Sequence, residues 1–284
     1  MNPYTDFVSG FARLVVDGRS LPLGGFPPVS RPKIGPDAPK ALFFAPHPDD
    51  ETVGGGLALR LLREAHWNVI DVAVTLGKLP ERKAARLQEL QGACAYLGFG
   101  LAQLAPNGLD NVNPVTRAKD PSAWSRKVEA AVKILAEHRP QVVFLPHELD
   151  WNSTHIGVHY LVMDALKAVK DLECYLVEME FWGQMQSPNL LVEFSAEEVA
   201  ELVAATSFHA GEVRRNPYHL LLPAWMQDNV RRGSELVGGQ GQAAAHFMFA
   251  QVYRLRRWNG SQVEESFSGG RFLTTPANAA SLFA

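Results

Sequence analysis

The feature that most constrains this chain is a short stretch, residues 41–56, in which an apolar run meets a dense group of charged side chains. Residues 41–45 are all apolar, which predicts a strand buried on both faces, and Pro46 ends it because proline cannot donate to the ladder. Four polar side chains follow directly: His47, Asp49, Asp50 and Glu51. Because α/β proteins bind ligands at the carboxyl ends of their strands, we predict the functional edge of the sheet here.

This charged group suits a cation better than a nucleotide. The acids precede the glycines at residues 54–56 and would face a pyrophosphate, and the spacing is neither G-x-G-x-x-G nor a P-loop. His47 and Asp50 lie three residues apart on a turn entering a helix, so both can face one ion, and nitrogen with carboxylate oxygen suits zinc. The alternative is that Asp49 and Asp50 simply cap the helix, but capping needs one acid and leaves His47 unexplained.

The composition is that of an ordinary globular chain. It has 284 residues, 46% of them hydrophobic, and a net charge of −3, so a sizeable core is expected and nucleic acid is not an expected partner. Cys94 and Cys174 each fall inside a predicted element, which indicates buried thiols in a reducing compartment. No apolar run approaches the ~18 residues of a membrane span, and no signal peptide is evident. We therefore expect no membrane span and a cytoplasmic location.

Strands and helices alternate from residue 40 onward. We expect strands near residues 40–45, 68–76, 101–104, 141–146 and 172–177, and helices near 52–64, 81–97, 122–138 and 154–170. This alternation predicts an α/β fold, a Rossmann-like parallel sheet flanked by helices, with a C-terminal extension.

A second polar group follows the strand at residues 141–146, which Pro146 ends. It consists of His147, Glu148, Asp150, Asn152, Thr154, His155 and His159, and it runs into the next helix. Parallel strands end at the same edge of the sheet, so both polar groups are expected to meet there. The alternative is a solvated loop followed by core histidines.

We divide the chain into one core and its flanking parts. The proline-rich residues 1–39 are expected to form an irregular N-terminal arm, and residues 40–178 the Rossmann-like metal-binding core. Residues 179–258, rich in aromatic side chains and methionine, are expected to complete the same domain with core, substrate or subunit contacts. Residues 259–284 are expected to be an extended or mobile tail. The later histidines, His209, His219 and His246, have no metal-type partner nearby in sequence and are interpreted as ordinary.

With both polar groups considered, the chain resembles the LmbE-like deacetylases, the family of N-acetylglucosaminyl-phosphatidylinositol de-N-acetylases and their bacterial relatives. Residues 46–51, Pro-His-Pro-Asp-Asp-Glu, match the first motif of the family closely. Residues 86–98 resemble the helix after the second strand, and residues 150–166 resemble the second metal motif with its helix. The resemblance covers about residues 40–170, and it implies a Rossmann-like sheet, one zinc ion and hydrolysis of an N-acetylglucosamine-type acetamide.

Carried over position by position, the resemblance implies roles for four residues. His47, Asp50 and His155 would be the zinc ligands, and Asp49 would be the general base that acts on a metal-bound water. Two adjacent aspartates cannot easily share one ligand role, which agrees with this division. Zinc would lower the pKa of its water to about 7 and polarise the amide oxygen.

The second motif departs from the family pattern. This chain has Asn152-Ser-Thr-His155 where the family usually has His-Pro-Asp-His, so Thr154 replaces an aspartate and Asn152 replaces the histidine that would polarise the oxyanion. Asparagine can donate a hydrogen bond but cannot carry charge. His159, one turn beyond His155, is the other candidate for this role, with a half-buried packing position as its alternative.

We therefore expect a zinc-dependent hydrolase that removes the N-acetyl group from a small amidosugar. One alternative is a zinc amidase acting on another amide, such as a thiol–sugar conjugate, because the specificity pocket belongs to the part of the chain that the motifs do not cover. The other is a metal- or sugar-binding protein without turnover, because the second motif is altered. A homo-oligomer is left open.

Overall fold

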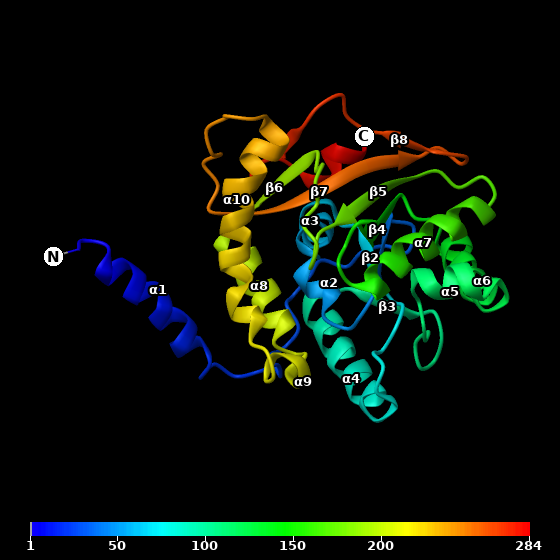
Figure 1. Cartoon of the computed structure of the whole chain (residues 1–284), viewed down its shortest axis with the longest axis horizontal. Coiled ribbons are helices and arrows are strands. Elements are labelled where there is room, and N and C mark those ends of the chain that lie inside the picture. The colour runs from blue at the N-terminus through cyan, green and yellow to red at the C-terminus, as the bar shows by residue number, and fades with distance from the viewer. Residues whose placement is uncertain (1) are drawn as a thin grey trace.

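The computed structural model describes residues 2–284 and consists of one large sheet with helices on both faces (Figure 1). The strands are β1 Lys40–Ala45, β2 Asn68–Ala73, β3 Gly100–Gln103, β4 Val142–Pro146, β5 Cys174–Met179, β6 Leu190–Phe194, β7 Phe249–Trp258, β8 Val263–Glu265 and β9 Arg271–Leu273. The α-helices are α1 Thr5–Gly18, α2 Asp50–Val53, α3 Gly56–Ala65, α4 Pro80–Leu97, α5 Pro114–Lys119, α6 Pro121–His138, α7 Ser153–Ala168, α8 Ala196–Thr206, α9 Ala210–Val213 and α10 Leu222–Gly238, joined by the 3₁₀ segments η1 Tyr218–Leu221 and η2 Ala279–Phe283.

The first five strands form the predicted parallel sheet. Their order is β3-β2-β1-β4-β5, so β1 and β4 are neighbours and their carboxyl ends lie together. Strands β2 and β3 are added on one side of β1, and β4 and β5 on the other, and this reversal of strand order creates the switch point at which α/β sheets bind ligands. This arrangement confirms the predicted fold class.

Strand β1 is buried on both faces because alternate side chains enter different cores. Phe43 packs in the hydrophobic cluster that contains Leu57 of α3 and Leu202 of α8. Phe44 packs in the opposite cluster with Leu161 of α7. A strand with apolar residues at every position therefore forms the centre of the molecule, as its sequence predicts.

The C-terminal part extends the same sheet. Strand β7 pairs antiparallel with both β5 and β6, and β9 pairs parallel with β6. The expected extended tail is instead ordered as β8, β9 and η2. The buried guanidinium of Arg60 donates to the carbonyl oxygens of Thr274 (3.1 Å) and Ala277 (2.6 Å), which fixes this segment.

The N-terminal arm differs from its expectation in one respect. Residues 20–39 are irregular and lie on the body, where Val29 N donates to Tyr96 O at 3.1 Å and Arg31 pairs with Glu201. Residues 5–18, however, form α1, which projects from the body (Figure 1). Pro3 lies before α1, and the other prolines that suggested irregular structure lie after it, from Pro22 onward.

The helix expected over residues 52–64 is divided into α2 and α3 at the glycines. A Cβ atom on Gly55 would lie 2.0 Å from Glu51 O, and one on Gly56 would lie 2.5 Å from the ring of Phe194. Glycine is required here because the backbone folds closely on itself just after the charged group. Among the described residues, no helix has the length and apolarity needed to cross a membrane.

Candidate metal centre

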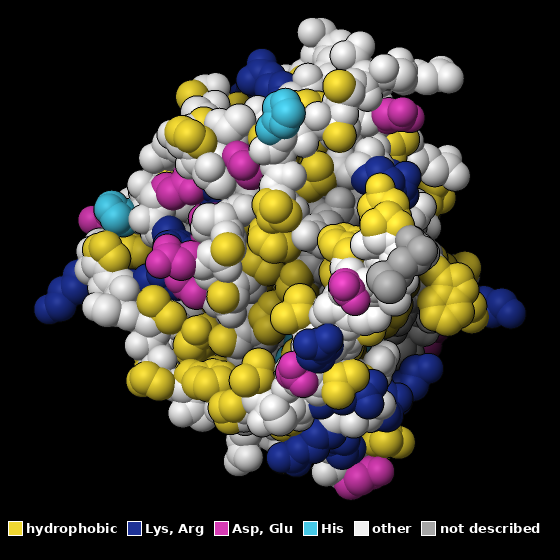
Figure 2. All heavy atoms as spheres, turned by 90° about the vertical axis from the view of Figure 1, so that its left-hand side faces the viewer, with side chains coloured by type: hydrophobic (Ala, Val, Ile, Leu, Met, Phe, Trp, Pro, Cys, Tyr) yellow, Lys and Arg dark blue, Asp and Glu magenta, His cyan; other side chains and the backbone are white. Residues whose placement is uncertain are grey.

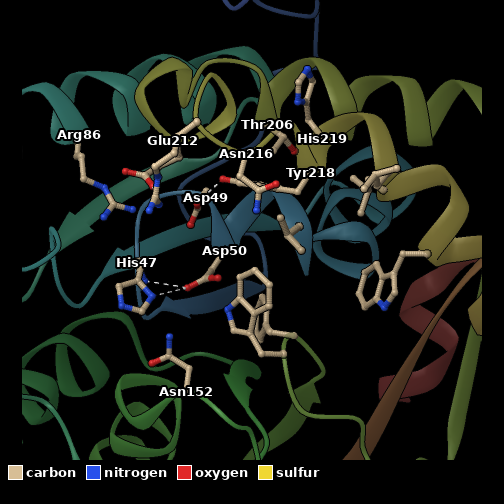
Figure 3. Close-up of a pocket in the computed structure, with 17 residues that line it drawn as sticks. His47, Asp49, Asp50, Arg86, Asn152, Thr206, Glu212, Asn216, Tyr218 and His219 are labelled. Atoms are coloured by element: carbon tan, nitrogen blue, oxygen red, sulfur yellow. Dashed lines mark hydrogen bonds and ion pairs between the residues drawn. The ribbon is translucent and has the colours of Figure 1, made fainter. Parts of the chain in front are cut away.

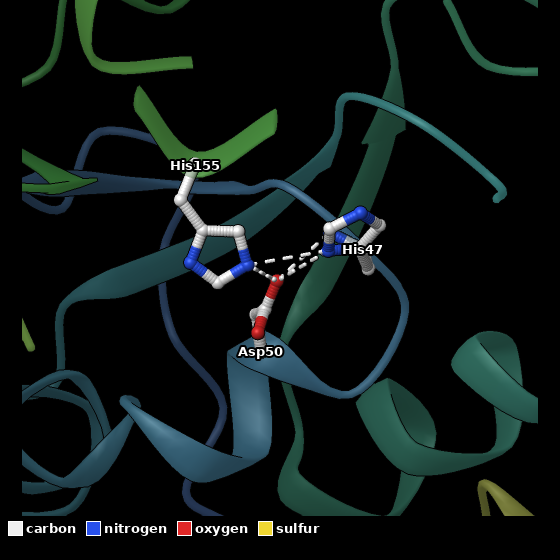
Figure 4. A group of neighbouring side chains, drawn as sticks. All are labelled: His47, Asp50 and His155. Atoms are coloured by element: carbon white, nitrogen blue, oxygen red, sulfur yellow. Dashed lines mark hydrogen bonds and ion pairs between the residues drawn. The ribbon is translucent and has the colours of Figure 1, made fainter. Parts of the chain in front are cut away.

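Three of the predicted ligands converge at the carboxyl ends of β1 and β4. His47 follows β1, Asp50 begins α2, and His155 lies in the first turn of α7. The three atoms His47 Nδ1, Asp50 Oδ2 and His155 Nε2 form a triangle in which each pair is 3.3 Å apart (Figure 4). Asp50 and His155 are buried, so the group is enclosed on the protein side.

The size of this triangle fits a tetrahedral metal ion. Ligand atoms about 2.0–2.1 Å from a zinc ion, at tetrahedral angles, are separated by about 3.3–3.4 Å. Three such ligands leave a fourth position for water or substrate. The surroundings also favour positive charge: burial lowers the pKa of His155, but Asp50 and Asp150 together raise it to about 10. The spacing of the three ligand atoms and the negative charge around them therefore both suit a metal ion.

The local sequence explains why these side chains converge. His47 N donates to Asp50 Oδ2 at 2.9 Å, so the tight turn after Pro46 holds imidazole and carboxylate together. At the other motif, Asn152 caps α7 by accepting a hydrogen bond from Thr154 N at 2.8 Å. This cap sets the start of α7 and thereby the position of His155.

Asp150 supports His155 from behind, although it was not among the predicted site residues. Asp150 Oδ1 lies 3.6 Å from His155 Nδ1, and the carboxylate accepts hydrogen bonds from the backbone N–H groups of Asn152 (2.7 Å) and Trp182 (3.1 Å). A carboxylate near the second ring nitrogen favours the ring orientation in which the other nitrogen faces a metal ion. The position of Asp150 in the second polar group was the available sequence signal.

Asp49 faces the pocket from a strained backbone conformation. Its φ of 121° lies in a region that favours glycine, and its N–H donates to Glu51 Oε2 at 2.8 Å. The hydroxyl group of Tyr218 donates a hydrogen bond to Asp49 Oδ2. Burial and the neighbouring Asp50 raise the pKa of Asp49 to about 7. The chain thus presents a carboxylate beside the ligand triangle that can exchange a proton near neutral pH.

Glu51 has a supporting role that involves a histidine from the C-terminal half. Its buried carboxylate lies 2.7 Å from His209 Nε2, and it also accepts from the backbone of Asp49. Burial lowers the pKa of His209, but Glu51 raises it above the ordinary value. His209 does not belong to the group of possible metal ligands, but it is the buried partner of Glu51, which lies 158 positions away in the sequence.

A cavity of about 370 Å³ opens onto His47, Asp49 and Asp50 (Figure 3). One part of its lining is apolar, formed by Val53, Phe181, Trp182, Leu221, Leu222 and Trp225. The other part is polar, formed by Arg86, Asn152, Thr206, Glu212, Arg215, Asn216, Tyr218 and His219. Most of the residues after position 178 in these lists could not be assigned from sequence motifs, although the C-terminal region was expected to contact substrate.

The two candidates for the oxyanion role lie in different places. Asn152 lines the cavity, and Figure 3 shows its side chain pointing toward it. Because its Oδ1 accepts the capping hydrogen bond, its NH₂ group is the part left for the cavity. His159 is not among the cavity-lining residues; its Nδ1 lies 3.0 Å from Pro146 O, and Glu178 lies 3.7 Å away. The structure therefore brings Asn152, and not His159, to the cavity.

Comparisons with known proteins agree with this site. Residues 42–166 match the family model described as PIG-L, GlcNAc-PI de-N-acetylase. No curated protein sequence matches the chain.

Solved structures share the fold at low sequence identity. N,N'-diacetylchitobiose deacetylase from Pyrococcus horikoshii is 16% identical with a TM-score of 0.56, covering 92% of this chain and 96% of its own. The zinc-inhibited form of teicoplanin deacetylase Orf2 is 14% identical with a TM-score of 0.53, covering 78% and 100%.

A solved structure with a different reaction has the same fold. GalB, the 4-carboxy-2-hydroxymuconate hydratase from Pseudomonas putida KT2440, is 17% identical with a TM-score of 0.56, covering 76% of this chain and 95% of its own. The fold alone therefore does not decide the reaction. Residues 42–166, which contain all three converging ligands, match the PIG-L family model, and this match confirms the resemblance to the LmbE-like de-N-acetylases seen in the motifs.

Proposed function

We propose that this protein is a zinc-dependent N-deacetylase acting on a small amidosugar. The observation that carries the proposal is the position of Asp49, which lines the same cavity as His47 and Asp50 without belonging to the ligand triangle. His47, Asp50 and His155 would hold the ion. When bound, zinc would supply Lewis acidity, which activates water and polarises the amide carbonyl.

Asp49 is proposed as the general base and then the general acid. A group with a pKa of about 7 can take a proton from the attacking water and return it to the leaving amine at neutral pH. The hydrogen bond from Tyr218 holds one carboxylate oxygen in place. Asp49 accepts a hydrogen bond from Tyr218, whereas Asp50 belongs to the ligand triangle, so separate roles are proposed for the two acids.

Asn152 is proposed to stabilise the negative charge that develops on the amide oxygen. Its NH₂ group faces the cavity, and a single donor of this kind typically contributes ~10²–10³-fold to turnover. His159 is proposed to act indirectly, because it holds Pro146 O at the end of β4 beside the site.

The cavity supports a sugar-sized substrate. A volume of about 370 Å³ is at the small end of ligand pockets, and it combines aromatic side chains with several hydrogen-bonding groups. Phe181 and Trp182 can pack against the face of a sugar ring, and Arg86 can bind its hydroxyl groups. An N-acetylglucosamine-type amide is therefore the proposed substrate class. The buried free thiols of Cys94 and Cys174 support the cytoplasmic location that we propose.

Release of free amine from a panel of N-acetylglucosamine conjugates tests the proposal. We expect amine release from the zinc-loaded protein, lost on chelation and restored by zinc. Turnover confined to other amides, such as a thiol–sugar conjugate, would favour the alternative of a zinc amidase with a different substrate. Binding of zinc and sugar without any amine release would favour a protein without turnover.

A further inference from the structure

Helix α1 presents an apolar face that the body of the protein does not cover. On this face, the N-cap Tyr4 is 69% exposed, and the helix exposes Phe7 (73%), Val8 (61%), Phe11 (45%) and Leu14 (71%); Val16 (64%) is exposed on another side of the helix. Within residues 2–284, Gly18 is the one buried residue of α1, where it contacts Leu220 of η1, and the three hydrophobic clusters include no α1 side chain. Figure 2 looks onto this side of the molecule and shows hydrophobic side chains gathered there.

A helix in this position needs a partner surface to be stable. An isolated helix of 14 residues is marginal in water, and in proteins most helical stability comes from packing an amphipathic face. Gly10, inside α1, costs a further ~1 kcal/mol relative to alanine. A Cβ atom on Gly10 would meet nothing within 4 Å, so the packing of this chain does not explain the glycine. Both observations point to a contact outside the chain.

The spacing of the apolar side chains is that of a helix-pairing seam. Tyr4, Phe7, Phe11 and Leu14 follow each other at intervals of three, four and three residues, which are consecutive a and d positions of two heptads. The charged side chains of α1, Asp6, Arg13 and Asp17, lie on the opposite side of the helix. Such a seam is self-complementary, so a second copy of the same helix fits it.

We propose that α1 pairs antiparallel with α1 of a second copy of this chain, around a two-fold axis. In this pairing Phe7 of one copy lies against Phe11 of the other, and Tyr4 lies against Leu14. Two aspartates against one arginine make α1 itself negative, which disfavours an anionic lipid surface as the occupant. This proposal is independent of the reaction at the metal centre.

The apolar area of this helix face is that of a small specific interface. Five side chains that each expose about 100 Å² give about 1,000 Å² over two helices, which is the size that a specific interface should reach. Leu221, which is 48% exposed, follows in the sequence the Leu220 that contacts Gly18 at the end of α1. An antiparallel partner brings its N-terminal turn to this point, beside a residue that lines the cavity.

Sedimentation equilibrium on the full chain tests the proposal. We expect twice the chain mass for the wild-type protein and a single chain mass for Phe7→Glu and for Phe11→Glu. Val16→Glu is the matched control: Val16 is 64% exposed but lies off the seam, so this variant keeps the dimer. A wild-type protein of single chain mass, or a dimer that both seam variants leave intact, would overturn the proposal.

Cross-linking tests the direction of the pairing and is feasible because Cys94 and Cys174 are buried. Under mild oxidation, a mixture of Phe7→Cys and Phe11→Cys chains is expected to form the mixed dimer in preference to either homodimer. Preferential Phe7→Cys homodimers would indicate parallel helices and refute the antiparallel arrangement. Co-sedimentation of a single-mass protein with neutral or anionic vesicles would assign α1 to a membrane surface instead.

Discussion

Asp49 and Asp50 are neighbours in the sequence, but their carboxylates have different surroundings. Asp50 Oδ2 lies 3.3 Å from two imidazole nitrogens, whereas Asp49 accepts a hydrogen bond from Tyr218. We therefore expect Asp49→Asn to keep zinc and to lower turnover ~10²–10⁴-fold, as loss of a general base does. Asp50→Ala is expected to lose the zinc itself. Zinc content by elemental analysis, measured beside amine release, checks both; equal loss of zinc would show that the pair is assigned wrongly.

Two histidines of α7, His155 and His159, are also expected to differ in their effect on zinc binding. His155 belongs to the ligand triangle, whereas His159 bonds Pro146 O behind it. We expect His155→Ala to abolish tight zinc binding, and His159→Ala to retain zinc while turnover falls moderately. Competition with a chromophoric chelator measures the affinity of each variant. Retention of zinc in His155→Ala together with its loss in His159→Ala would reverse the assignment.

For individual site residues, the sequence predicts the side chains that lie within one motif, but it does not predict their partners from distant parts of the chain. His47 and Asp50 are three residues apart, and their shared target could be inferred from spacing alone. Tyr218 meets Asp49 across 169 positions, and no local pattern in the sequence indicates that contact. Such partners become visible only when the C-terminal half folds over the end of the sheet.

Between the elements, one carboxylate joins three helices on the α7 side of the sheet. Asp164 of α7 accepts hydrogen bonds from Arg117 of α5 (2.8 Å) and from the indole of Trp124 in α6 (2.9 Å). Burial raises the pKa of Asp164, but these partners lower it below its ordinary value overall. The ionised carboxylate therefore contributes stability above the unfolded-state pKa of ~3.9, and this contribution is lost as the pH falls through the lower folded-state pKa.

We accordingly expect Asp164→Asn to lower the free energy of unfolding by ~1 kcal/mol at neutral pH. The difference from the wild-type protein should vanish at the acid end of the titration, because Asp164 is then protonated in both states. Urea unfolding at a series of pH values measures it. Asp228→Asn, which removes the exposed pair with Arg231, is the control and should change stability by less than ~0.5 kcal/mol. A difference that persists unchanged in acid would contradict the pKa argument.

Helices and strands could be predicted where one pattern of apolar residues continues over the whole element. The uniformly apolar runs of β1 and β4 gave their burial and their place in the sheet. The break between α2 and α3 was not anticipated, because helical periodicity continues through the glycines, and only the close approach of Glu51 O to Gly55 requires it. Strand β7 was also not predicted, because Arg254, Arg256 and Arg257 interrupt its apolar pattern. In the structure each of these arginines pairs with a glutamate.

For the whole molecule, the metal centre joins segments that are far apart in the chain. His47 and Asp50 lie in the loop and helix after β1, and His155 begins the helix after β4, so a bound ion links the two motifs of the sheet edge. An ion that binds the folded state alone stabilises it by ~2.7 kcal/mol at 100 times its dissociation constant. For a chain of this size, that corresponds to an increase in Tm of ~4–5 °C.

Thermal unfolding with and without zinc therefore measures the coupling between the site and the fold. We expect the increase in Tm for the wild-type protein and for His246→Ala, whose histidine is exposed and outside the site. The increase should be absent in His155→Ala, because two remaining ligands cannot enclose the ion. Asp150→Asn should show an intermediate increase, since it leaves three ligands but weakens the hold on His155, a change that costs 10–100-fold in metal affinity, or ~1.4–2.7 kcal/mol. An equal increase in all four proteins would place the stabilising zinc elsewhere on the molecule.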